Sequence, residues 1–126
     1  MTTALWCVLA AALLPYLGTM LAKAGGRMPI RNNRNPREWL DQLQGWPKRA
    51  HWAQQNGFEA FPPFAAAVLT AQMLHAPQPR VDQLALAFIG FRLAHLVAYL
   101  TDLASLRSLL WFGGMGCMVW LFVLGA

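Results

Sequence analysis

The chain has 126 residues, of which 57% are hydrophobic and only 12% are charged. Soluble domains carry about 25% charged residues, so this composition excludes an ordinary soluble protein. The formal net charge of +5 is concentrated, because seven of the ten basic residues lie between positions 23 and 49. We therefore expect an integral membrane protein with one sizeable polar loop.

Four apolar stretches follow one another, each about long enough to cross a hydrocarbon core of about 30 Å at roughly 1.5 Å per helical residue. The first stretch lacks a basic leading segment and is too long for a typical signal peptide, so we expect it to be retained. We predict an all-α membrane protein with one domain, residues 1–126, that forms a four-transmembrane-helix bundle. The expected spans are residues 3–23, 48–74, 81–102 and 106–125.

The basic segment 23–49 joins the first two expected spans and decides the predicted orientation. Basic loops stay in the cytoplasm, so we expect a multi-pass protein of a bacterial inner membrane with both termini in the periplasm. Within this loop, residues 37–46 have the apolar spacing of a short helix on the membrane surface. Nucleic-acid-binding proteins also carry basic segments, but topology and attraction to anionic membrane lipids explain this one, and we predict no nucleic-acid partner.

The second and third expected spans carry polar residues at matched depths. Arg92 lies at the centre of the third span, where an unpaired arginine costs roughly 2.5–3.5 kcal/mol. Counted from the cytoplasmic ends, Glu59 and Arg92 both lie about 15 Å deep, and Asn56 and His95 about 10 Å deep. We therefore predict a buried Glu59–Arg92 ion pair, which serves either to hold the helices together or as part of a site.

Further polar side chains lead from this pair toward the cytoplasmic interface. Tyr99 shares a helical face with Arg92 and His95, and Gln54 precedes Asn56 on the second span. Such a row predicts a polar pocket that opens at the interface.

Arg107 and Ser108 lie where the fourth span begins, with Ser105 as the expected N-cap. An arginine beside free backbone N–H groups favours an anion such as a carboxylate or a thiolate. The alternative is that Arg107 only fixes the helix end at the cytoplasmic interface.

The remaining cysteines and histidines indicate no other chemistry. Cys7 and Cys117 lie inside spans without a CxxC partner and are interpreted as small apolar residues. His51 and His75 are isolated near the interfaces, where we expect them to be solvated. No metal site is predicted, because His95 has no cysteine or histidine at ligand spacing.

Two long motifs, RAHWAQQNGFEAFPPF at 49–64 and FRLAHLVAYLTDLASLRS at 91–108, resemble the MAPEG family, membrane-associated proteins of eicosanoid and glutathione metabolism. The likeness is to its microsomal prostaglandin E synthase and glutathione transferase branches. It implies a homotrimer that binds glutathione between subunits near the cytoplasmic side.

The resemblance also implies a role for each matching residue. Arg107 would stabilise the glutathione thiolate with Ser108 beside it, and Arg92 would hold Glu59. The thiolate would attack a lipophilic electrophile or hydroperoxide that arrives from the membrane lipids. The residues implied in contact with glutathione are Gln54, Asn56, Glu59, His95 and Tyr99.

One difference between this sequence and the family enzymes supports an alternative function. Trp52 occupies a position where family enzymes usually carry an arginine, and the nearest arginine is Arg49. The alternative is a non-catalytic MAPEG-like protein with a lipid-binding or accessory structural role. A third hypothesis is a proton- or ion-handling protein that uses Glu59, Arg92 and His95. It lacks a continuous polar path, because the apolar stretch 109–126 carries no charge and the first span offers only Lys23 at its end.

Overall fold

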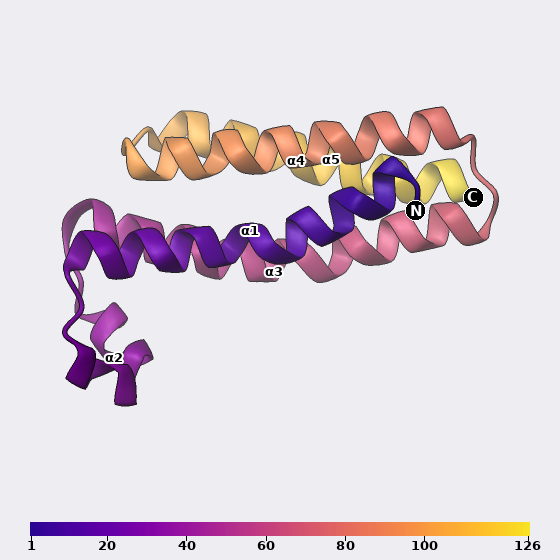
Figure 1. The fold of residues 1–126 in the computed structure, drawn as a ribbon. Helices are drawn as coiled ribbons and strands as arrows, with labels where there is room; N and C mark the ends of the chain where they lie inside the picture. The colour runs from indigo at the N-terminus through magenta and orange to yellow at the C-terminus, as the bar shows by residue number, and fades with distance from the viewer.

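The computed structural model describes the whole chain, residues 1–126. Four of the helices have 22 or more residues. Figure 1 shows the long helices running side by side, with a short segment that projects from one end. We call this end the loop end, and the opposite end, where both termini lie, the terminal end. The elements in order are α1 (Thr3–Gly26), the 3-10 helix η1 (Ile30–Arg34), α2 (Pro36–Asp41), α3 (Gly45–Met73), α4 (Gln78–Leu100) and α5 (Ala104–Gly125).

The membrane prediction is confirmed in its main point. The helices α1, α4 and α5 are each long and apolar enough to cross a membrane. The fourth long helix, α3, has 29 residues but is less apolar than the other three, because its first half carries most of the polar residues. Each long helix begins within three residues of the predicted start.

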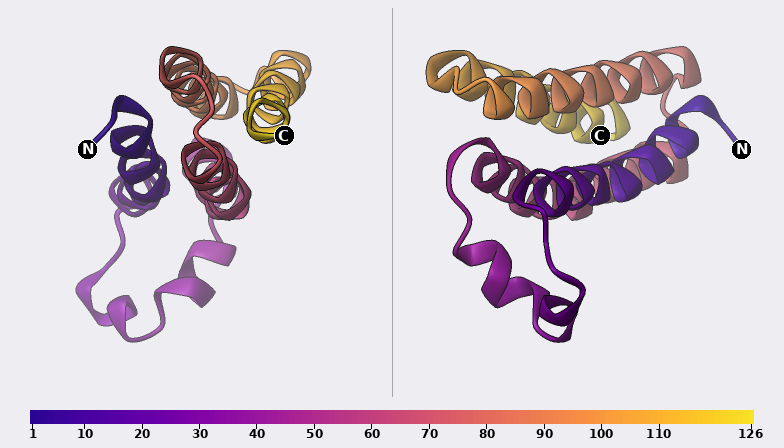
Figure 2. Two further views of the ribbon diagram at one scale, coloured as in Figure 1. Left: turned by 90° about the vertical axis from the view of Figure 1, so that its right-hand side faces the viewer. Right: turned by 60° about the vertical axis from the view of Figure 1, so that its left-hand side comes forward.

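Left-handed residues close the turns between the last three helices. His75, after α3, has φ 55°, and Asp102, after α4, has φ 59°. A residue in this conformation ends a helix abruptly and reverses the chain. Consequently α4 runs antiparallel to both α3 and α5, and Figure 2 shows α1 packed beside α3 and α4 beside α5.

Small residues let α1 approach α3 closely. A Cβ atom added at Gly18 would lie 3.1 Å from both the Ala50 carbonyl oxygen and the Gln54 Cβ. One added at Gly57 would lie 2.9 Å from Cγ of Pro15. Small residues at such contacts are typical of membrane helices, which gain stability from close backbone packing.

The terminal end is held by a polar network. Asp82 on α4 accepts hydrogen bonds from the Ala4 backbone N–H and from Gln78 Nε2, both at 2.8 Å. Gln72 on α3 donates to the Thr2 hydroxyl at 3.1 Å and to Gln78 Oε1 at 2.9 Å. The network satisfies a free N–H group at the start of α1 and joins α1, α3 and α4.

A second set of contacts fixes the loop end. Arg49 donates to the carbonyl oxygens of Tyr99 and Leu100, at 3.0 and 3.1 Å, which satisfies the C-terminus of α4. His51, expected to be solvated, is instead buried: its Nε2 lies 3.1 Å from Asp41 Oδ1 and its Nδ1 lies 3.2 Å from Gln54 Oε1. The prediction was wrong because the end of α2 folds back toward this part of α3, where Leu40 packs in one cluster with Ala50.

Candidate functional site

A polar pocket opens between α3, α4 and α5 near the loop end. Its volume is about 160 Å³. Five predicted site residues line it together with two aromatic residues, so the structure brings together side chains from three helices. We call it the Arg107 pocket; its lining residues are Asn56, His95, Tyr99, Arg107, Ser108, Trp111 and Phe112.

Aromatic contacts hold the cation of this pocket in place. The Cζ atom of Arg107 lies 4.6 Å from the Tyr99 ring centroid. The Tyr99 ring in turn lies edge-on to His95, with centroids 5.1 Å apart. Stacking on the ring orients the guanidinium without neutralising it, and Arg107 forms no ion pair within the chain. Its charge is therefore free to bind an anion.

Asn56, which lines the pocket, has a side-chain oxygen that lacks the hydrogen bond its burial requires. The side-chain oxygen of Asn56 is buried and accepts no hydrogen bond from the protein. Buried polar atoms are nearly always paired, and an unpaired acceptor costs roughly 1–3 kcal/mol. A ligand N–H or O–H group in the Arg107 pocket would satisfy it.

The first turn of α5 adds backbone donors beside Arg107. The predicted N-cap at Ser105 is wrong: α5 begins at Ala104, Leu103 is the N-cap residue, and no side chain caps the helix. Because Leu103 has no hydroxyl or carboxylate, the first N–H groups have no side-chain acceptor. These donors and Arg107 share one turn, which favours an anionic ligand.

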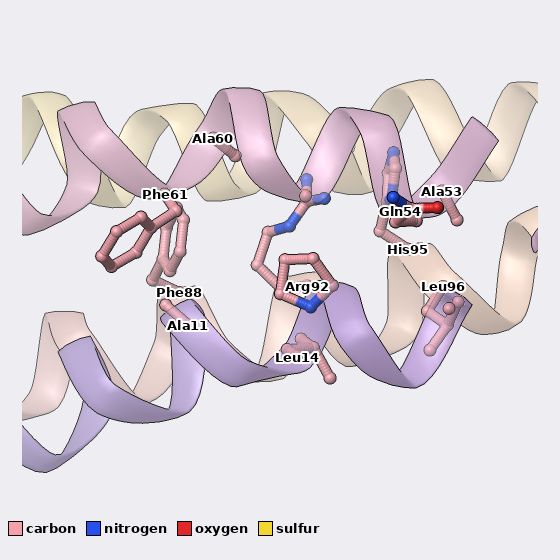
Figure 3. Close-up of a pocket in the computed structure, with 13 residues that line it drawn as sticks. Ala11, Leu14, Ala53, Gln54, Ala60, Phe61, Phe88, Arg92, His95 and Leu96 are labelled. Atoms are coloured by element: carbon pink, nitrogen blue, oxygen red, sulfur yellow. The ribbon is translucent and has the colours of Figure 1, made fainter. Parts of the chain in front are cut away.

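Two other predicted residues line a separate cavity inside the bundle. This cavity lies between α1, α3 and α4, has a volume of about 20 Å³, and is lined by the polar side chains of Gln54, Arg92 and His95. Figure 3 shows the Arg92 side chain extending between the helices, with Gln54 beside His95. We call it the Arg92 cavity. Only His95 lines both this cavity and the Arg107 pocket.

The predicted Glu59–Arg92 ion pair is not formed. Glu59 is exposed on the surface of α3, whereas Arg92 is buried and pairs with no carboxylate. Ala60 and Gly57 face the Arg92 cavity, and successive helical residues differ by about 100° in direction. Glu59 therefore points away, although its depth along the helix matches that of Arg92.

Trp52, at the position where family enzymes usually carry an arginine, does not line the Arg107 pocket. Trp52 is exposed on α3, and the Nζ atom of Lys48 lies 5.8 Å from its ring centroid. Arg49, the nearest arginine, bonds the end of α4 and lines neither cavity. The Arg107 pocket thus has one arginine, and the nearest substitute is engaged elsewhere.

Sequence reasoning missed two walls of the pocket. Trp111 and Phe112 were not assigned to the site, yet both line it. Trp111 follows Arg107 by four residues, so helical spacing alone places the two on one face of α5. They supply an apolar wall beside the polar one.

Comparison with known proteins decides the family. The sequence model of the MAPEG family matches residues 3–126, almost the entire chain. The chain belongs to the MAPEG family. This membership agrees with the membrane-spanning length and hydropathy of α1, α4 and α5. The MAPEG family includes glutathione transferases and eicosanoid synthases. No curated protein matches the chain.

Proposed function

We propose that this MAPEG protein is a glutathione-dependent transferase or peroxidase that acts on lipophilic electrophiles or hydroperoxides at the membrane. The observation that carries the proposal is the Arg107 pocket, where an uncompensated arginine, free helix N–H groups and the unpaired Asn56 oxygen meet. Glutathione is an anionic tripeptide at neutral pH and offers N–H donors and carboxylates to such a wall.

In the proposed reaction, Arg107 stabilises the thiolate form of glutathione, and the Ser108 hydroxyl donates a hydrogen bond to the sulfur. A thiol is a weak nucleophile until it is ionised, so a nearby cation accelerates attack. With an electrophile, the sulfur forms a thioether as the leaving group departs with its electron pair. With a hydroperoxide, sulfur takes one oxygen, an alcohol leaves, and a second glutathione converts the sulfenic acid to a disulfide and water.

We further propose that the working unit is a homotrimer in which α3 is the fourth span. One surface of α3 exposes residues at alternating spacings of three and four, at positions 52, 55, 59, 62, 66, 69 and 73. Glu59 and Gln55 lie on this surface, and lipid would not solvate them. A neighbouring subunit would cover them and place Glu59 beside a glutathione bound between subunits.

The location of both termini at one end of the bundle fits an even number of spans (Figure 1). Basic loops are retained in the cytoplasm, so we propose that the Arg107 pocket faces the cytoplasm and that both termini lie in the periplasm of a bacterial inner membrane. Glutathione would enter from water, and the lipophilic substrate from the bilayer.

A second candidate function is lipid binding without catalysis. An open apolar groove of about 490 Å³ runs along α5 and is lined by Phe112, Met115, Gly116, Val119, Trp120 and Val123. Together with Trp52 in place of an arginine, this groove fits a protein that holds an acyl chain.

Activity assays separate the two functions. The purified protein in detergent is mixed with glutathione and either a chloronitrobenzene electrophile or an alkyl hydroperoxide, and conjugate or disulfide is measured. We expect turnover that falls at least tenfold in Arg107→Ala and stays unchanged in Arg80→Ala, which changes an exposed arginine at the terminal end. Folded protein without turnover of either substrate would favour lipid binding.

A further inference from the structure

The Arg92 cavity is separate from the Arg107 pocket and lies within a single bundle. Its walls come from α1, α3 and α4, so a neighbouring subunit does not need to contribute. Its volume of about 20 Å³ exceeds the 10–15 Å³ or so that one water-sized particle occupies, but it is far too small for a tripeptide. A chloride ion is larger than a water molecule but far smaller than a tripeptide.

The polar lining of this cavity can donate hydrogen bonds, and no carboxylate contributes to it. Arg92 and His95 are 8% and 3% exposed, and neither forms a hydrogen bond or an ion pair with another side chain. Gln54 directs its carbonyl oxygen to His51, which leaves its amide N–H group free. Arg92, Gln54 and His95 therefore bring side-chain N–H donors to a cavity that no carboxylate lines.

The charge of Arg92 needs compensation. A buried charge without a partner is strongly unfavourable in a membrane helix, and the carboxylate at matched depth, Glu59, is exposed on another face of α3. A water molecule would accept hydrogen bonds but would leave the charge unbalanced. A monovalent anion accepts hydrogen bonds and also balances the charge of Arg92.

We propose that the Arg92 cavity binds one small monovalent anion of chloride size, held by Arg92, Gln54 and His95. The anion replaces the missing carboxylate and stabilises the contact of α4 with α1 and α3. The proposal does not depend on glutathione, because the two sites share only His95.

The size of the cavity predicts ion selectivity. Chloride and bromide fit, whereas gluconate is too large to enter. Thermal unfolding of the purified protein in detergent, at constant ionic strength and without glutathione, is measured in each salt. We expect the wild type to unfold at least about 2 °C higher in chloride or bromide than in gluconate.

Two variants show whether the higher unfolding temperature in chloride arises from binding in the Arg92 cavity. Arg92→Met should remove the difference between chloride and gluconate, whereas Arg107→Met should retain it, because Arg107 does not line the cavity. Equal unfolding temperatures for the wild type in the two salts would overturn the proposal. An undiminished chloride effect in Arg92→Met would do the same.

Crystals of the wild type grown in bromide provide a test that needs no variant to fold. We expect an anomalous peak among the Arg92, His95 and Gln54 side chains. Density for an ordered water without an anomalous signal would show that the cavity is hydrated only and would overturn the proposal.

Discussion

Arg107 lies over the face of Tyr99, with its Cζ atom 4.6 Å from the ring centroid. The ring therefore fixes where the single arginine of the pocket presents its charge. Tyr99→Leu should weaken glutathione binding about two- to thirtyfold, since a cation–π contact contributes about 0.5–2 kcal/mol. Tyr99→Phe keeps the ring and should bind within about twofold of the wild type. Equal affinities for Tyr99→Leu and the wild type, measured by calorimetry, would contradict this role.

The unpaired oxygen of Asn56 gives a prediction about ligand-dependent stability. Asn56→Leu removes a buried acceptor that no protein group satisfies, so the free protein should lose little stability or become more stable. Glutathione should raise the unfolding temperature of the wild type but have a smaller effect on the variant. A variant that is strongly destabilised without glutathione would show that Asn56 has a protein partner.

Asp82 links the start of α1 to α4. Asp82→Ala should lower the free energy of unfolding by about 1–2 kcal/mol, because the Ala4 N–H and the Gln78 amide both lose their acceptor. Asp82→Asn, which keeps an oxygen in place, should lose about half as much or less. Thermal unfolding in detergent measures both, and glutathione affinity should be unchanged because the network lies at the other end of the bundle. A larger loss in Asp82→Asn than in Asp82→Ala would contradict the acceptor role.

The close approach of α1 and α3 predicts a contrast between two glycines. Gly18→Leu forces atoms against the Ala50 carbonyl and should destabilise the protein by about 1–3 kcal/mol. Gly90→Leu is the control, because a Cβ atom there meets nothing within 4 Å. If both variants unfold at the same temperature, α1 and α3 are not as close as the structure has them.

His51 and Asp41 join α2 to α3, although Asp41 is largely exposed. Such a pair contributes less than about 1 kcal/mol to stability, so Asp41→Ala should leave the unfolding temperature nearly unchanged. It should nevertheless loosen residues 27–44 and increase the rate of trypsin cleavage at the arginines of this segment. Cleavage at the wild-type rate would show that the Asp41 contact does not hold the loop.

Comparison of sequence and structure shows what helical patterns determine. Depth along a helix follows from counting residues, and the convergence of Asn56, His95 and Tyr99 was predictable in this way. Direction around the axis depends on which neighbours each helix packs against, and these were unknown for α3. Glu59 was therefore paired with Arg92 in the prediction, whereas it is exposed on a different face.

The loop end was harder to predict for a similar reason. His51 looked isolated in the sequence, but its partner Asp41 is ten residues away and reaches it only because the loop folds back. Ser105 was expected to be the N-cap residue of α5, but α5 begins at Ala104, so Ser105 lies in its first turn. Both cases depend on loop geometry that apolar periodicity does not encode.

Calorimetric titration of glutathione into the purified wild type in detergent, repeated with Arg107→Ala and Arg80→Ala, tests the central claim most directly. The account predicts wild-type binding in the micromolar-to-millimolar range, at least about tenfold weaker binding by Arg107→Ala, and no change for Arg80→Ala. Folded wild type that binds no glutathione, or that binds it as well after Arg107→Ala, would contradict the account.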